Sequence, residues 1–147
     1  LRLFRRHIGT LYLFMKYVIL VALIFSLVGC FSETSNAPKL SFNHSELPIK
    51  LEEHVDGNWD RVCFLGPYTN NEAAKELIGL DWPLESLSSV WVNDGVTLLV
   101  FLNNGAVVSF YEVSRHPLDF SSLTNTCVKR NSSTFTKNGS QVVQTKV

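Results

Sequence analysis

The chain has 147 residues, of which 46% are hydrophobic and 18% are charged, so it can form one modest globular domain. Its formal net charge is zero, but the first 29 residues carry four basic side chains and no acidic one. The rest of the chain therefore holds nine basic and 13 acidic residues, a net charge of −4. A mildly acidic body argues against nucleic acid as a partner, because binding to phosphates needs a positive surface.

The N-terminal part contains an apolar run that is too short for a comfortable membrane span. Residues 17–29, YVILVALIFSLVG, hold no charged side chain. A spanning helix needs about 20 apolar residues, whereas the apolar core of a secretory signal needs about 7–15. The run follows Met15, the only methionine, and Lys16. We therefore predict that Met15 is the initiator, that residues 1–14 come from an over-extended reading frame, and that residues 15–29 are a signal peptide.

The end of this run resembles the lipobox of bacterial lipoproteins. Its residues are Leu27, Val28, Gly29 and Cys30, and a polar segment follows. The resemblance implies that the Cys30 thiol receives a diacylglycerol, that a signal peptidase cuts between Gly29 and Cys30, and that the new amine is acylated. Several acyl chains would hold the protein on a membrane far better than one. The resemblance also implies a location in the bacterial cell envelope. In such lipoproteins an Asp after the cysteine retains the protein at the inner membrane, so Phe31 at this position implies the outer membrane, on the side facing the periplasm.

Two other interpretations of the chain remain open. An uncleaved single-span membrane protein would keep residues 1–29 in the mature chain. Glycosylation sequons at Asn43, Asn131 and Asn138 would suit a secreted eukaryotic protein. The lipobox-like sequence favours the lipoprotein over both.

Composition divides the rest of the chain into three parts. Residues 30–47 are rich in Ser and Asn and predict a flexible tether. Residues 48–137 contain β-type runs separated by turn signals and predict the globular domain. Residues 138–147 predict a frayed tail, with an added strand as the alternative.

The domain is predicted to be α+β, with an antiparallel sheet of about five strands and one short helix packed on it. Residues 89–93, 96–102 and 106–113 are separated by Asp94-Gly95 and Asn104-Gly105, which are signals for two-residue hairpin turns. They predict a three-stranded antiparallel meander whose middle strand, VTLLVFL, is apolar on both faces. Upstream, TNNE predicts a capping box with Thr69 as the N-cap of a helix that ends at Gly79. The other strand candidates are residues 59–65, 125–130 and 133–136.

Cys63 and Cys127 are predicted to form a disulfide. With Cys30 lipidated, they are the remaining pair among three cysteines of an exported protein, and both lie in β-type runs. In the chain-entropy model, a link that closes a loop of this length is worth about 4 kcal/mol. We expect no metal site and no cofactor, because the chain has no C-x-x-C pair and its four histidines are scattered.

The sequence gives two hypotheses for activity. The first is a non-enzymatic module that binds another envelope protein or a small ligand, with Tyr68 and Trp82 as exposed anchors at the two ends of the predicted helix. The second is a small periplasmic hydrolase that uses His116 and Asp119. No G-x-S-x-G sequence accompanies that pair, so the binding module is favoured.

Overall fold

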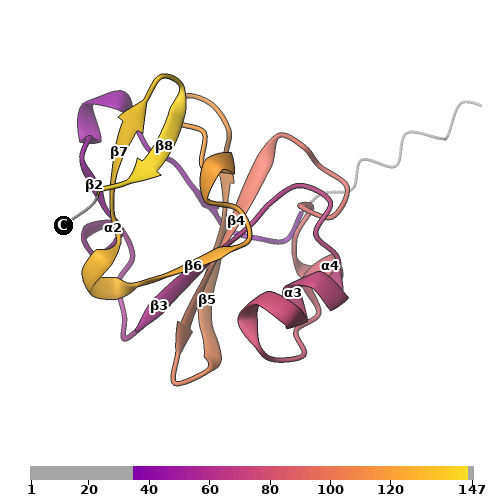
Figure 1. Cartoon of the computed structure of the whole chain (residues 1–147). Helices are drawn as coiled ribbons and strands as arrows, with labels where there is room; N and C mark the ends of the chain where they lie inside the picture. Colours follow the sequence, from indigo (N-terminus) through magenta and orange to yellow (C-terminus); the bar gives the residue numbers. More distant parts are fainter. Residues whose placement is uncertain (1–34, 146–147) are drawn as a thin grey trace, which may run out of the picture. The chain divides into compact units, whose positions relative to one another are not determined.

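The computed structural model describes residues 35–145, which are coloured by sequence in Figure 1. The predicted extension, the signal peptide, and the cleavage and lipidation site at Gly29 and Cys30 lie outside these residues. Among the helices of residues 35–145, none is both long and apolar enough to cross a membrane. The strands are β1 (Lys39–Leu40), β2 (Ile49–Lys50), β3 (Arg61–Leu65), β4 (Val96–Asn103), β5 (Ala106–Ser114), β6 (Thr126–Lys129), β7 (Thr134–Asn138) and β8 (Gln141–Gln144). The helices are α2 (Leu51–His54), α3 (Asn71–Ile78) and α4 (Leu84–Leu87), with 3₁₀ turns η1 (His44–Glu46), η2 (Ser121–Leu123) and η3 (Arg130–Ser132).

The central element is a five-stranded sheet with the order β1-β5-β4-β3-β6. Its pairs are antiparallel, except that β1 pairs parallel with β5 over Glu112 and Val113. A second, antiparallel sheet has the order β2-β7-β8. The fold class is therefore α+β, as predicted, but the strands are more numerous than predicted and one pair is parallel.

The five-stranded sheet lies between two layers, which Figure 1 shows on its two sides. Helices α3 and α4 cover one face, and β2, α2, β7 and β8 cover the other. The core under the helices includes Leu65, Ile78 and Val90, all essentially inaccessible to solvent. The opposite core is rich in aromatic rings, which are Phe42, Trp59, Phe64, Phe101, Phe120 and Phe135. The sheet thus separates two apolar cores, one on each of its faces.

Strand β4 contributes to both cores. Successive side chains of a strand point to opposite faces, so Leu98 and Val100 join the core under the helices while Leu99 and Phe101 join the aromatic core. All four side chains are fully buried. The prediction that the VTLLVFL run is covered on both faces is confirmed.

Only half of the predicted meander is correct. The hairpin at Asn104-Gly105 joins β4 to β5, and both turn residues have the positive φ that a type I′ turn needs. Residues 89–93, however, form turns, and β3 occupies the place beside β4 that was predicted for them. The Asn93 side chain accepts a hydrogen bond from the Gly95 N–H and donates one to Ser89 Oγ. Such local side-chain bonds compete with extended backbone and explain the difference.

The domain extends beyond the predicted boundaries on both sides. The predicted tether, residues 30–47, contributes β1, and its Ala37 and Phe42 are 6% and 2% exposed. The predicted tail, residues 138–147, contributes β8, which pairs with β7 and buries Val142. Both segments are mostly polar, yet Phe42 and Val142 reach the same aromatic core, and that burial fixes them.

Helix α3 starts one residue later than predicted. Its N-cap is Asn70, whose side chain accepts a hydrogen bond from a backbone N–H, whereas the Thr69 hydroxyl donates to a loop carbonyl. Gly79 ends the helix in the left-handed conformation with φ 84°, as predicted. Asn71 and Glu85 exchange two hydrogen bonds, since each side-chain oxygen accepts from the backbone N–H of the other residue. This exchange ties α3 to α4, a single-turn helix that was not predicted.

The predicted disulfide between Cys63 and Cys127 is confirmed. The two residues are direct register partners on β3 and β6, with an S–S distance of 1.99 Å and a Cα–Cα distance of 4.0 Å. Cys63 belongs to the core under the helices and is fully buried. The bond links positions 64 residues apart, so it closes a loop that contains α3, β4 and β5.

We expect the double variant Cys63→Ala, Cys127→Ala to lower the free energy of unfolding by up to about 4 kcal/mol, because the unfolded chain regains the entropy of the open loop. Denaturant unfolding of the full chain measures this loss as a lower midpoint. Ser45→Ala, at an exposed position, is the control and should leave the midpoint unchanged. An unchanged midpoint in the double variant would contradict a stabilising role for the bond.

Candidate functional site

A buried carboxylate, that of Glu112 in β5, was not predicted from the sequence. The residue is 2% exposed. Its Oε1 atom accepts hydrogen bonds from Ser35 Oγ (2.6 Å), Ser88 Oγ (2.8 Å), the Ser89 N–H (2.6 Å) and Ser89 Oγ (3.0 Å). A buried charge is costly unless such partners stabilise it. Glu112 therefore joins the start of the described chain and the turn at Ser88 and Ser89 to the centre of the fold.

The environment of Glu112 keeps its side chain ionised. Burial alone raises the pKa of Glu112, because it penalises the charged form. The hydrogen bonds from Ser35, Ser89 and Ser88 favour the carboxylate and outweigh burial, so the pKa lies below its ordinary value of 4.5. A general base at neutral pH needs the opposite shift. Glu112 is thus suited to hold the fold together and not to transfer protons.

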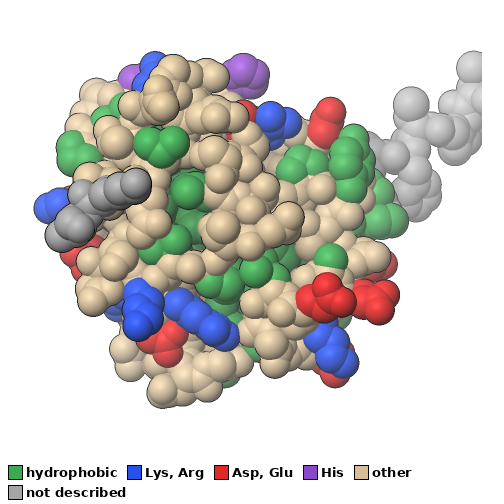
Figure 2. All heavy atoms as spheres, in the orientation of Figure 1, with side chains coloured by type: hydrophobic (Ala, Val, Ile, Leu, Met, Phe, Trp, Pro, Cys, Tyr) green, Lys and Arg blue, Asp and Glu red, His purple; other side chains and the backbone are tan. Residues whose placement is uncertain are grey.

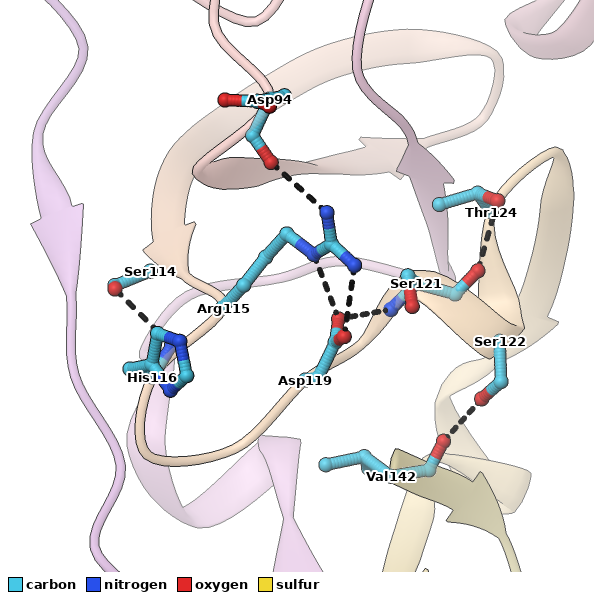
Figure 3. Close-up of polar contacts among 9 residues, drawn as sticks. All are labelled: Asp94, Ser114, Arg115, His116, Asp119, Ser121, Ser122, Thr124 and Val142. Atoms are coloured by element: carbon cyan, nitrogen blue, oxygen red, sulfur yellow. Dashed lines mark hydrogen bonds and ion pairs between the residues drawn. The ribbon is translucent and has the colours of Figure 1, made fainter. Parts of the chain in front are cut away.

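Asp119 forms a second polar cluster, shown in Figure 3. Its carboxylate accepts hydrogen bonds from Arg115 Nε (3.2 Å) and Arg115 Nη2 (3.0 Å), and from the Ser121 N–H (2.9 Å). Burial raises the pKa of Asp119, but the hydrogen bonds from Arg115 and Ser121 lower it by more, so the pKa lies below its ordinary value. The Arg115 guanidinium also donates to the carbonyl of Asp94. The cluster therefore fastens the chain after β5 to the turn before β4.

The structure does not join His116 and Asp119 into a catalytic pair. Figure 3 shows the Asp119 carboxylate directed at the Arg115 guanidinium. Within residues 35–145, the hydrogen bonds of that carboxylate go to Arg115 and Ser121, and His116 is exposed and bonds Ser114 only through its backbone N–H. A base that is oriented by an acid needs a hydrogen bond between them. The geometry gives the hydrolase hypothesis no support.

The two predicted anchors, Tyr68 and Trp82, differ in exposure and in their surroundings. Tyr68 is 67% exposed and has a positive φ of 64°, and its N–H donates to the carbonyl of Val90. Trp82 is half-buried, and its ring meets the ring of Phe110 edge-on with centroids 5.0 Å apart. Trp82 lines two grooves, and Tyr68 lines neither of them. Only Trp82 is therefore positioned as the wall of a recess.

The first of these grooves, the acidic groove, lies along α3 and the loop that leads to α4. It has a volume of about 880 Å³, and its charged and aromatic lining residues are Glu72, Lys75, Glu76, Asp81 and Trp82. Lys75 is paired with Asp81 at 2.8 Å, so Glu72 and Glu76 leave the groove negative. Figure 2 shows acidic side chains gathered over this helical side. An aromatic wall beside negative charge suits the side chain of a Lys or Arg.

The second groove, the uncharged groove, lies on the other side of Trp82 and runs along β5. It has a volume of about 430 Å³, and no side chain in its lining carries a charge at neutral pH. Among its lining residues are Pro38, Leu80, Trp82, Val108, Phe110 and Tyr111. Val108 is 50% exposed. The two grooves thus share one tryptophan and differ in charge.

The acidic segment around His54 does not form a metal site. His54 stacks edge-on against Phe42, Glu53 pairs with Lys50, and Asp60 accepts a hydrogen bond from the Asn104 N–H. Within residues 35–145, no group of three His, Cys, Asp or Glu side chains could hold a metal ion.

No protein-family model, no curated protein and no solved structure matches the chain.

We expect Glu112→Gln to lower the free energy of unfolding by about 1–3 kcal/mol, because the amide loses the charge that strengthens these hydrogen bonds. The pKa of Glu112 is lowered in the folded state, so its contribution is fully present above pH 4.5 and is lost as the pH falls through the folded-state value. Denaturant unfolding between neutral and acidic pH should therefore show a shallower acid decline in the variant than in the parent chain.

Glu52→Gln, at an exposed position of α2, is the matched control and should change neither the stability nor the acid decline. Some acid dependence should survive in Glu112→Gln, because Asp119 also has a lowered pKa. If the two variants show the same acid decline, Glu112 does not have the role assigned to it.

Proposed function

We propose that the protein is a lipid-anchored protein of the bacterial cell envelope that binds another envelope protein and catalyses no reaction. The binding role rests on one observation, the acidic groove whose wall is Trp82, held edge-on against Phe110. The anchor is supported by the lipobox-like sequence that ends at Cys30. The proposed location is the outer membrane, on the side that faces the periplasm.

The chemistry of the acidic groove suggests the kind of partner. Glu72 and Glu76 provide negative charge that would attract a basic segment and speed its association. The ring of Trp82 would provide the apolar contact, since tryptophans dominate the affinity of many interfaces. We therefore propose a partner segment in which a Lys or Arg stands beside an apolar side chain. Tyr68 lies outside both grooves, so we expect its contribution to be smaller.

The anchor is tested by the intact mass of the protein extracted from its host membranes. We expect the mass of residues 30–147 with added acyl chains, and we expect Cys30→Ala to lose both the cleavage and the lipid. The acyl chains make membrane association resistant to salt, because their binding is apolar. A mass that retains residues 15–29 without lipid would mean an uncleaved membrane segment and would refute the lipoprotein.

The groove is tested by capture of a partner from host membranes with the full chain as bait. We expect Trp82→Ala to weaken capture by about 2 kcal/mol, or roughly 30-fold, since a central aromatic contact is lost. We expect Glu76→Lys to weaken capture as well, by slowing association.

Glu52→Lys makes the same charge change on α2, in the layer on the opposite face of the sheet, and serves as the matched control. It should leave capture unchanged, because exposed charges separated by more than the Debye length of about 8 Å are screened at physiological salt. Equal effects of the two charge reversals would mean that total charge, and not the acidic groove, governs the interaction.

A further inference from the structure

The chain is fixed to the domain from Ser35 onward. Ser35 Oγ donates a 2.6 Å hydrogen bond to Glu112 and accepts one of 3.1 Å from the Ala37 N–H. Ala37 is buried, and the carbonyl of Pro38 accepts a hydrogen bond from the Glu112 N–H. The described part of the predicted tether of residues 30–47 therefore belongs to the domain.

The short link between Cys30 and Ser35 limits how a domain anchored at Cys30 can face a membrane. Five peptide units join Cys30 to Ser35, and five residues span at most about 17 Å. A compact domain of about 110 residues has a radius of gyration of about 13 Å and hence a diameter of about 34 Å. The link is shorter than the domain is wide. A bilayer that holds Cys30 must therefore lie on the side of the domain that carries Ser35.

The uncharged groove lies on that side. Pro38, three residues after Ser35, is part of its lining, together with Val108 and Trp82. Because no lining side chain is charged, contact with lipid would not bury an ionised group, which would be energetically costly. Tryptophan is also the side chain that favours the interface between lipid and water. Position and chemistry thus agree on a lipid surface.

A further protein strand is a poorer occupant of the same place. Among the described strands, β1 covers only Glu112 and Val113 on the outer edge of β5. The register of β5 with β4 shifts opposite Phe101 and Leu102, which marks a bulge next to Val108. Bulges twist an edge strand and discourage another strand from pairing with it. The edge beside the groove is therefore open and yet unsuited to strand addition.

We propose that the uncharged groove rests against the bilayer and that the short link to Cys30 holds it there. This proposal depends on the lipid anchor proposed above. The apolar contact sets the orientation of the domain, while the acyl chains supply the affinity. Trp82 then lies at the boundary between lipid and water, and the acidic groove on its other side opens beside the membrane, where a partner in the same membrane would meet it.

The test is the accessibility of nitroxide labels on the lipidated full chain in phosphatidylcholine vesicles. Val108→Cys carries the label in the uncharged groove, and Lys137→Cys carries it on β7, in the layer on the other face of the sheet. We expect the Val108 label to lose collisions with a water-soluble nickel complex when vesicles are added, and the Lys137 label to keep them. Both labels accessible on protein whose mass shows the acyl chains would overturn the proposal.

Two further measurements complete the design. Membrane-extracted protein whose mass shows no acyl chains would refute the anchor, whereas an accessible Val108 label on lipidated protein would refute the orientation alone. A 20-residue Gly/Ser insert between Glu33 and Thr34 spans about 25 Å on average and should return the Val108 label to water. Protection that survives the insert would contradict the short link as its cause.

Discussion

The hydrogen bonds accepted by the buried Glu112 carboxylate hold several surface segments of the domain in place. The carboxylate fixes Ser35, and with it the parallel strand β1, and it fixes Ser88 and Ser89 in a turn. That turn places the carbonyl of Val90, which accepts the hydrogen bond from Tyr68. One buried anion thus sets where the chain enters the domain and how the exposed tyrosine is presented. Hydrogen bonds from neutral donors suffice, because four of them converge on a single oxygen.

The same strand links this anchor to the candidate site. Phe110 stands two residues before Glu112, so both side chains point to the helical face of the sheet. Phe110 supports the ring of Trp82, which separates the acidic groove from the uncharged groove. A disturbance at Glu112 would therefore reach Trp82 through a displacement of β5. Phe110 and Glu112 are thus successive residues on one face of β5.

The sequence predicted the features that depend on local turn and helix-end signals, and the disulfide that follows from the number of cysteines left to pair. The hairpin at Asn104-Gly105, the helix stop at Gly79 and the Cys63–Cys127 bond are of this kind. Glu112 could not be predicted, because a buried glutamate and a solvent-facing one at the end of a strand look the same in sequence. Its donors lie 77, 24 and 23 positions away, and only the folded chain brings them to it.

Of the candidate site, the sequence indicated Trp82 but not the two grooves, because the grooves are formed by segments that only the fold brings together. Trp82 was selected because it stands at one end of the predicted helix, and it does line two grooves. The grooves themselves join α3 to the loop before α4, and Pro38 to β5, and no local pattern reports such contacts. His116 and Asp119 were paired by proximity in sequence, but the intervening chain turns so that Arg115 meets the carboxylate first.

The way β1 joins the sheet has a mechanical consequence. A pull on the chain ahead of Ser35 acts first on the hydrogen bond to Glu112 and then on a strand of only two residues. The loop closed by Cys63 and Cys127 contains α3, β4 and β5 and cannot be extended by such a pull. Force applied to this end of the chain would therefore release β1 from β5 first, while the disulfide prevents the loop that it closes from being extended.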